Sequence, residues 1–208
     1  MTVFNEGKHT GEFLLSEGNG SISRETVTIS SAAAALVPGT VLGKITLGAV
    51  TSAAVAGNTG NGTMGSVTLS LGAKPGVYKL TIVEPASNTG AFVVEDPDGI
   101  IIGNGDVASA FSAGGLAFTL ADGATDFASG DQFNITVAAG SGKYVAYDSA
   151  ATNGAAVAAG VLYAAAPDSA SDQKAVAIVR MAEVIEAELT GIDAAAKAQL
   201  AALNIICR

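Results

Sequence analysis

The chain contains 208 residues with a mass of 20.4 kDa, of which 49% are hydrophobic and only 5% aromatic. This length allows one large domain or two small ones, and the apolar content is sufficient to bury a core, so we do not expect general disorder. Ten basic residues against 19 acidic ones give a net charge of -9, which repels the phosphate backbone and disfavours nucleic-acid binding.

Membrane insertion is also disfavoured by the pattern of apolar residues. The mean hydropathy is +0.44, but the longest apolar stretches are short and diluted by Ala and Gly. None reaches the ~20 consecutive apolar residues that span a bilayer, so we predict no transmembrane helix and no membrane partner. Glu6 and Glu12 stand where a signal peptide has a basic start and an apolar run, so we do not expect secretion by that route.

In chain order, residues 1–30 are polar and punctuated by Gly, with isolated apolar side chains and no sustained periodicity. Such a segment buries too little surface to fold alone, which predicts an extended arm that becomes ordered on a partner. Within it, residues 25–29 (ETVTI) alternate, with Val27 and Ile29 on one face, and this alternation predicts a strand. Residues 36–47 contain a turn at Pro38 and Gly39 followed by a β-branched run, which predicts a second strand.

Residues 49–142 have a different character, because short runs rich in Val, Ile, Thr, Tyr and Phe recur between Gly, Asn, Asp and Pro. The runs are SVTLSL (66–71), VYKLTIV (77–83), AFVVED (91–96), LAFTLAD (116–122) and QFNITVA (132–138). Regular short strands of this kind predict an antiparallel sandwich or barrel. The segment holds two lysines and eight acidic residues, a net charge of -6, and therefore most of the acidity of the chain.

The C-terminal part returns to Ala- and Val-rich strands and ends in a helix. KYVAYD (143–148) and AAGVLYAA (158–165) predict strands, whereas KAVAIVRMAEV (174–184) suits either a strand or a helix. The pattern from Thr190 to Asp193 resembles a capping box and opens an Ala-rich helix with Leu200 and Leu203 on one face. We expect the helix to end at Asn204 in a left-handed conformation, with Ile205 as its apolar partner.

Groups that carry out catalysis are scarce. The sequence has a single His, His9, in a polar segment, and a single Cys, Cys207, beside the C-terminus. We interpret His9 as a solvated side chain and Cys207 as a small buried one, which leaves no internal disulfide. The Gly-rich stretch 57–62 lacks the lysine and the helix of a phosphate-binding loop. The sequence therefore predicts no enzyme and no cofactor.

Two acidic turns are the weak candidates for a calcium site. Asp96 and Asp98 form one turn and Asp122 and Asp126 the other, and alternate carboxylates are typical calcium ligands. Neither turn has the full ligand spacing, and Asp-Gly sequences are also the commonest turn chemistry between strands. We therefore favour plain turns and predict no metal.

Several segments at both ends of the chain form a recognisable pattern. They are NEGKHTGEFLLSEGNGSISRETVTI (5–29), LVPGTVLGKI (36–45), GKYVAYDSAATNGAAVAAGVLYAA (142–165), AVAIVRMAEV (175–184) and GIDAAAKAQLAALNIICR (191–208). Together they resemble the bacteriophage lambda-type head decoration proteins. Joining Ile45 directly to Lys143 gives a chain of ordinary family length, so residues 49–142 look like a domain inserted into a surface loop.

This resemblance implies a mainly β (α+β) fold. We expect a capsid-binding arm over residues 1–30, and a small decoration-protein β core over 31–48 and 143–208 with one C-terminal helix. Residues 49–142 would form an inserted antiparallel β-sandwich-like domain.

The resemblance also implies a cementing role on the virion. The protein, made in the host cytoplasm, would bind the outside of the expanded head as a homotrimer and hold neighbouring major capsid protein subunits together. The arm strand 25–29 would add to a capsid sheet edge. The residues expected to contact the capsid are Phe13, Leu14, Leu15, Ile22, Val27 and Ile29.

An alternative reading assigns the activity to residues 49–142, as a surface module for host or glycan ligands. That reading requires an exposed aromatic cluster or a calcium-lined site. Five aromatic residues of the segment lie mostly in strand positions that are expected to be in the core. They are Tyr78, Phe92, Phe111, Phe118 and Phe133.

Overall fold

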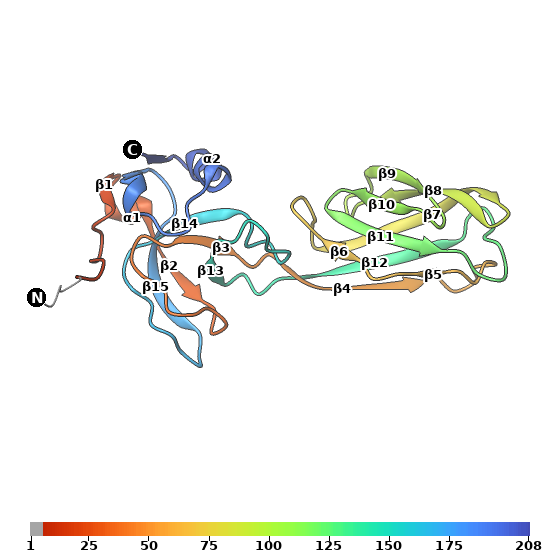
Figure 1. The fold of residues 1–208 in the computed structure, drawn as a ribbon, viewed down its shortest axis with the longest axis horizontal. Coiled ribbons are helices and arrows are strands. Elements are labelled where there is room, and N and C mark those ends of the chain that lie inside the picture. Colours follow the sequence, from red (N-terminus) through yellow and green to blue (C-terminus); the bar gives the residue numbers. More distant parts are fainter. Residues whose placement is uncertain (1–5) are drawn as a thin grey trace, which may run out of the picture. The chain divides into compact units, whose positions relative to one another are not determined.

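The computed structural model describes residues 6–208, and the chain divides into two compact units (Figure 1). The first unit combines the chain up to Ile45 with Gly142–Arg208, and the second is Thr46–Ser141. Within residues 6–208, no helix has the length and apolar character needed to cross a bilayer. The strands of the first unit are β1 (Leu14–Glu17), β2 (Arg24–Ile29), β3 (Val41–Lys44), β13 (Tyr144–Ala146), β14 (Ala158–Leu162), β15 (Gln173–Ile178), β16 (Ala182–Val184) and β17 (Ile205–Cys207). Its helical segments are α1 (Gly20–Ser23), the 3-10 helix η1 (Glu186–Glu188) and α2 (Ala194–Ala202).

The first unit is built on a closed five-stranded barrel in the order β13-β2-β15-β14-β3. β2 confirms the strand predicted from residues 25–29, and its alternation has the expected cause, since Val27 and Ile29 are buried in the barrel core. β2 pairs antiparallel with β15 on one side and parallel with β13 on the other. One edge of this strand is therefore paired along its length, and the other is paired at Ile29.

A second core lies where the small sheet β1-β16-β17 and helix α2 pack against barrel residues. The helix contributes Ala196 and Leu200, both fully buried, and β17 contributes Ile205. β1 runs antiparallel to β16, whereas β17 runs parallel to it. This arrangement ties the C-terminus to the N-terminal strand through β16.

The helix α2 starts and ends on identifiable residues. Its N-cap is Asp193, whose side chain accepts a hydrogen bond from the Ala196 N–H at 2.7 Å, so the expectation of a capping box that begins at Thr190 is wrong. Thr190 lies before the helix, where it bridges to Thr40. Asn204 has φ 59°, which confirms the predicted left-handed residue after the helix.

The ambiguous stretch KAVAIVRMAEV forms two strands rather than a helix. β15 ends at Ile178 and β16 begins at Ala182, and Met181 between them has φ 51°. A left-handed Met breaks a helix and a strand alike, so the chain turns here from the barrel to the small sheet.

The second unit consists of two antiparallel sheets around one core. A five-stranded sheet has the order β4-β12-β7-β8-β9, and a smaller sheet has the order β10-β11-β5, with β6 also paired to β11. The strands are β4 (Leu47–Ala54), β5 (Thr63–Met64), β6 (Thr68–Leu69), β7 (Gly76–Ala86), β8 (Thr89–Glu95), β9 (Ile101–Asp106), β10 (Ala110–Ala113), β11 (Leu116–Ala121) and β12 (Gln132–Ala139). The expectation of a mainly β fold is confirmed.

The core of the second unit draws on both sheets. Phe92 of the larger sheet lies with Phe111 and Phe118 of the smaller one, and the ring centroids of Phe111 and Phe118 are 4.9 Å apart. Tilted aromatic contacts at this separation add to the burial of apolar area. The two sheets are thus joined by a shared aromatic cluster.

The two places where the chain leaves and re-enters the first unit are hydrogen-bonded neighbours. The Ile45 N–H donates to the Lys143 carbonyl, and the Gly142 N–H donates to the Ile45 carbonyl, each at 2.9 Å. β3 and β13 continue this antiparallel pairing in the barrel. The chain therefore departs and returns at one point of the first unit.

Candidate functional site

The N-terminal segment from Gly11 onward is docked on the first unit. The Gly11 N–H donates to the Tyr163 carbonyl at 3.1 Å. Gly11 has φ 73°, and a Cβ at this position would lie 2.9 Å from the Tyr163 ring, so both backbone and packing favour Gly here. The expectation of an extended arm is therefore corrected for residues 11–29, while residues 1–5 lie outside the described part of the chain.

Five of the six residues expected to contact the capsid fall into two groups, and the sixth, Leu14, is half-buried. Phe13, Val27 and Ile29 are buried in the two cores of the first unit. Their side chains therefore contribute to its hydrophobic stabilisation. Leu15 and Ile22 are 53% and 43% exposed, so these side chains are open to a partner.

Leu14 and Leu15 differ because of an irregularity in β1. The register of β1 on β16 shifts between Leu14 and Ser16, which leaves Leu15 outside the regular alternation. Leu14 packs against the second core of the unit, whereas Leu15 points away from it. The bulge therefore turns one of two adjacent leucines to the surface.

Two strands of the first unit bear on the expected pairing with a capsid sheet edge. β2 pairs with β15 along its whole length, whereas on its other side the pairing with β13 involves Ile29 alone. β1 stands at the end of the order β1-β16-β17 and, within residues 6–208, pairs with β16 alone. Its outer edge retains main-chain groups that can pair with a partner strand.

An ion pair and a ring contact fix the end of β1. The Arg24 guanidinium donates from Nε to Glu17 Oε2 at 2.9 Å and from Nη2 to Oε1 at 2.5 Å. The guanidinium carbon also lies 3.9 Å from the centroid of the Tyr163 ring. The hydrogen bond from Arg24 lowers the pKa of Glu17 below its usual value. Bidentate pairing combined with a cation–π contact holds the segment in one geometry.

The outer face of the sheet β1-β16-β17 contains a shallow hollow of about 510 Å³. Met181 and Ile206 are exposed there. Glu183 of the central strand β16 pairs in register with Ser16 of β1 on one side and with Ile206 of β17 on the other. Ser16 donates to Glu183 Oε2 at 2.9 Å, and Arg208 donates to Oε1 at 2.7 Å, so the carboxylate is held in place and its pKa is lowered, chiefly by Arg208. The hollow is lined by Ser16, Glu17, Gly18, Met181, Ala182, Glu183, Asn204 and Ile206.

This surface has the chemistry of a binding face. The apolar side chains exposed at the hollow are Met181 and Ile206, its charged groups are paired in the ion pairs Arg24–Glu17 and Arg208–Glu183, and Leu15 and Ile22 are exposed on β1 and α1. Apolar groups within a polar rim are typical of protein–protein contacts. The sequence predicted Leu15 and Ile22 as contact residues. It missed Met181 and Ile206, because these two occur in runs whose other members are in the core.

The first calcium candidate is a turn closed by a lysine. Asp96 is buried and accepts hydrogen bonds from the N–H groups of Asp98 and Ile100 at 2.9 and 3.0 Å. Lys74 Nζ lies 2.8 Å from Asp96 and 2.6 Å from Asp98. The Lys74 hydrogen bond, followed by that of the Ile100 N–H, lowers the pKa of Asp96. An ammonium group occupies the place that a calcium ion would need.

The second calcium candidate does not converge either. Asp126 accepts a hydrogen bond from the Asn88 N–H at 2.9 Å, whereas Asp122 has a buried Oδ1 without a partner. Across residues 6–208, no group of three or more His, Cys, Asp or Glu side chains is placed to hold a metal ion. Asp96 and Asp98 thus belong to one turn, whereas Asp122 and Asp126 lie in the loop after β11.

The aromatic residues of the second unit offer no stacking platform. Tyr78, Phe92, Phe111, Phe118 and Phe133 are all buried in its core. The Tyr78 hydroxyl accepts a hydrogen bond from the Lys74 N–H at 2.7 Å, which satisfies its polar end. The structure places these rings as the sequence indicated, and sugar stacking would require them at the surface.

His9 and Cys207 are not combined into a catalytic arrangement. His9 is exposed, with Nε2 3.0 Å from Glu6 Oε1. Cys207 is half-buried, and burial raises the pKa of its thiol, which disfavours the thiolate form. His9 and Cys207 therefore do not form a pair of nucleophile and base.

One buried carboxylate was missed by sequence reasoning. Asp131 accepts hydrogen bonds from the N–H groups of Thr59, Gly60 and Ala128 at 2.8 to 3.0 Å. Burial by itself raises the pKa of Asp131, but the three N–H donors outweigh this effect and the pKa lies below its usual value. The residue anchors the Gly-rich loop 57–62, and nothing in its local sequence distinguishes it from a turn aspartate.

Comparison with known proteins identifies the class. The chain matches the family described as bacteriophage lambda head decoration protein D over residues 3–205, and it belongs to that family. It is therefore a phage capsid decoration protein, in a structural family that is not enzymatic, and its place is on the virion capsid.

Other comparisons add little. No curated protein matches the chain. FlgL of Xanthomonas campestris has 20% identity and a TM-score of 0.34, with 49% of this chain and 33% of that chain covered. FlgL of Legionella pneumophila has 18% identity and a TM-score of 0.33, with 50% and 37% covered. The hook junction protein FlgK of Burkholderia pseudomallei has 23% identity and a TM-score of 0.34, with 60% and 21% covered. This chain spans about a third of the FlgL chains, and these TM-scores are too low to carry an argument.

Proposed function

We propose that the protein is a cementing protein that binds the outside of the expanded head as a homotrimer and stabilises contacts between major capsid protein subunits. The observation that carries this proposal is the family match, which covers nearly the whole chain from residue 3 to residue 205. The described residues supply a binding face and no catalytic group, which suits attachment rather than chemistry. Synthesis in the host cytoplasm and assembly onto the outer surface belong to the same proposal.

The capsid contact is proposed for the face around β1. Leu14 is half-buried, so the exposed Leu15 and Ile22 remain as contact residues, and Met181 and Ile206, exposed at the hollow of the small sheet, are added to them. The free edge of β1 offers main-chain hydrogen bonds to an extended capsid segment. Three such faces on one trimer share a high effective concentration, which raises avidity by about 10² to 10⁴ over a single contact.

The domain organisation follows the same proposal. The arm would comprise residues 1–30, of which 11–29 are docked here, and the decoration-protein core would comprise 31–48 and 143–208. Residues 49–142 would be the inserted β-sandwich-like domain, close to the second compact unit at Thr46–Ser141. The hydrogen bonds between Ile45, Gly142 and Lys143 support an insertion into a loop whose flanking strands stay paired.

Surface variants test the capsid contact. Leu15→Asp and Ile206→Asp should each weaken binding to expanded heads by about tenfold, as expected for loss of a contact worth about 1.4 kcal/mol. Leu71→Asp is the matched control, because Leu71 is 65% exposed but lies in the second unit. Binding is measured by co-sedimentation with purified heads. Equal binding by all three variants and the wild type would remove this face from the proposal.

A host- or glycan-binding role for the second unit receives no support from the site. The rings that would stack on a sugar are buried, and the acidic turns are closed by Lys74 and by main-chain N–H groups. We therefore propose no second function of that kind.

A further inference from the structure

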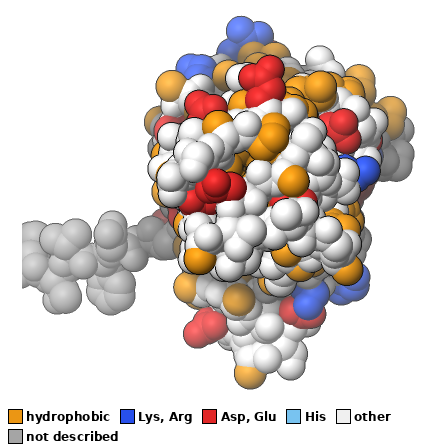
Figure 2. All heavy atoms as spheres, turned by 90° about the vertical axis from the view of Figure 1, so that its right-hand side faces the viewer, with side chains coloured by type: hydrophobic (Ala, Val, Ile, Leu, Met, Phe, Trp, Pro, Cys, Tyr) orange, Lys and Arg blue, Asp and Glu red, His pale blue; other side chains and the backbone are white. Residues whose placement is uncertain are grey.

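Charge is unevenly distributed in the second unit. Residues 45–73 and 107–121 contain no charged side chain. They supply β4, β5, β6, β10 and β11, whereas the acidic residues lie on β7, β8, β9 and the turns. In the view of Figure 2, acidic side chains appear as separate groups on a largely uncharged surface. An acidic protein thus carries a neutral region in which a contact would bury no charge.

The strand β4 forms an unprotected edge within this neutral region. It stands at the end of the order β4-β12-β7-β8-β9 and, among residues 6–208, pairs with β12 alone. Natural edge strands are usually short, charged, interrupted by Pro or bulged. β4 has eight residues without charge or Pro, and its one bulge, where Gly48 and Ala49 oppose Ala138 of β12, lies near its start, so residues 50–54 keep a regular register. The opposite edge strand, β9, is shorter and contains Asp106.

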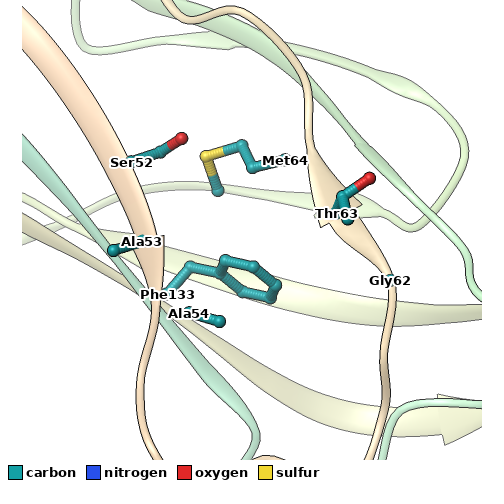
Figure 3. A pocket seen from close by; sticks show the side chains of 7 residues that line it. All are labelled: Ser52, Ala53, Ala54, Gly62, Thr63, Met64 and Phe133. Carbon is teal, nitrogen blue, oxygen red and sulfur yellow. The ribbon is translucent and has the colours of Figure 1, made fainter.

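A hollow beside β4 shows that the smaller sheet leaves this edge uncovered. It has a volume of about 210 Å³ and lies between β4 and β5, with Met64 and Phe133 on its walls (Figure 3). Ser52 and Ala54 pair in register with the buried Ile135 and Phe133, so they lie on the core side of the sheet, yet both are exposed. A strand added to β4 would place alternate side chains beside this hollow.

We propose that β4 pairs with β4 of a second copy of this chain, antiparallel and about a two-fold axis, so that two five-stranded sheets become continuous. An antiparallel pair of identical strands is self-complementary, as an isologous contact requires. Copies with a net charge of -9 repel one another, and β4 is where two of them meet without bringing charges together. The contact is a property of the free protein. Its use between neighbouring copies on a head rests additionally on the proposed function.

Sedimentation velocity on the full chain tests the pairing. We expect the wild type to associate beyond its basal oligomer as the protein concentration rises to about 1 mM, as for a weak contact with a Kd in that range. Thr51→Lys should weaken this association at least tenfold, and an equimolar mixture of Thr51→Lys and Thr51→Glu should restore it. Thr136→Lys is the control, because Thr136 is the exposed partner of Thr51 on β12 but does not lie on the edge strand. Absence of wild-type association, or equal association by Thr51→Lys, would overturn the proposal.

Cysteine cross-linking identifies the occupant. In a Cys207→Ser background, Ala53→Cys on β4 should give disulfide-linked dimers, whereas Asn104→Cys on β9 should not. The reaction is followed by non-reducing electrophoresis of the free protein and of decorated heads. A cross-link from Ala53→Cys to a different protein, or equal dimer yields from both positions, would contradict a β4–β4 contact.

Discussion

At the scale of single residues, the second unit depends on Asp131. Its carboxylate gathers three N–H groups from two loops, those of Thr59, Gly60 and Ala128. Leaving buried N–H donors without acceptors is costly, so Asp131 stabilises these loops, together with the hydrogen bonds of Asn58 to Gln132 and of Asn61 to the Thr125 N–H. The Gly-rich sequence 57–62, which resembles a ligand-binding loop, is thereby assigned a structural role.

Asp131→Asn should lower the free energy of unfolding of the second unit by about 1–3 kcal/mol at pH 7, because the amide NH₂ faces N–H donors. The lowered pKa of Asp131 also predicts acid sensitivity. Its contribution is fully present above the usual value of 3.8 and is lost as the pH falls through the lower folded value. Chemical denaturation at pH 7 and pH 3 measures both effects. Asp126→Asn, which removes an exposed carboxylate, is the control; an equal loss for the two variants would contradict the account.

At the scale of elements, the sequence predicted strands well where apolar and polar residues alternate. VYKLTIV became β7 because Tyr78, Leu80 and Ile82 face the core. β4 and β9 were missed, since LGAVTSAA and IIGNGD are rich in Ala and Gly and lack a clear period. Their pairing to β12 and β8 is a tertiary effect that local propensity does not encode.

The binding face was only partly predictable for a similar reason. The sequence of residues 11–29 does not reveal that Phe13 fills a core formed by α2, β16 and β17, far away in the chain. Isolated apolar residues in a polar segment indicate burial or a partner, and packing decides between the two. Leu15 and Ile22 stayed at the surface because the β1 bulge and the α1 turn direct them there.

The cap of α2 gives a discriminating test at this scale. Asp193→Ala should destabilise the first unit by about 0.5–2 kcal/mol, since it removes the acceptor for the Ala196 N–H. The Tyr147 hydroxyl, 3.2 Å from both Asp193 carboxylate oxygens, would lose its acceptor as well. Thr190→Ala should be close to neutral, although the sequence pattern alone favours Thr190 as the cap. Thermal unfolding of both variants measures the difference, and the reverse order would refute the assignment.

At the scale of the whole molecule, the chain leaves and re-enters the first unit at residues that are hydrogen-bonded neighbours. The Ile45 carbonyl already accepts from the Gly142 N–H, which is the bond that closes a two-residue hairpin. Replacing residues 46–141 by Asn-Gly should therefore leave a folded first unit that still binds heads. Circular dichroism and co-sedimentation measure the two properties. An unfolded product would show that the first unit depends on the second.

The central claim is decoration of the mature head, and its most direct measurement is the number of copies bound per capsid subunit on expanded and unexpanded heads. Purified protein is titrated onto each kind of head and quantified after co-sedimentation. The account predicts saturable binding to expanded heads alone, close to one copy per capsid subunit. Equal binding to both kinds of head, or binding to neither, would contradict it.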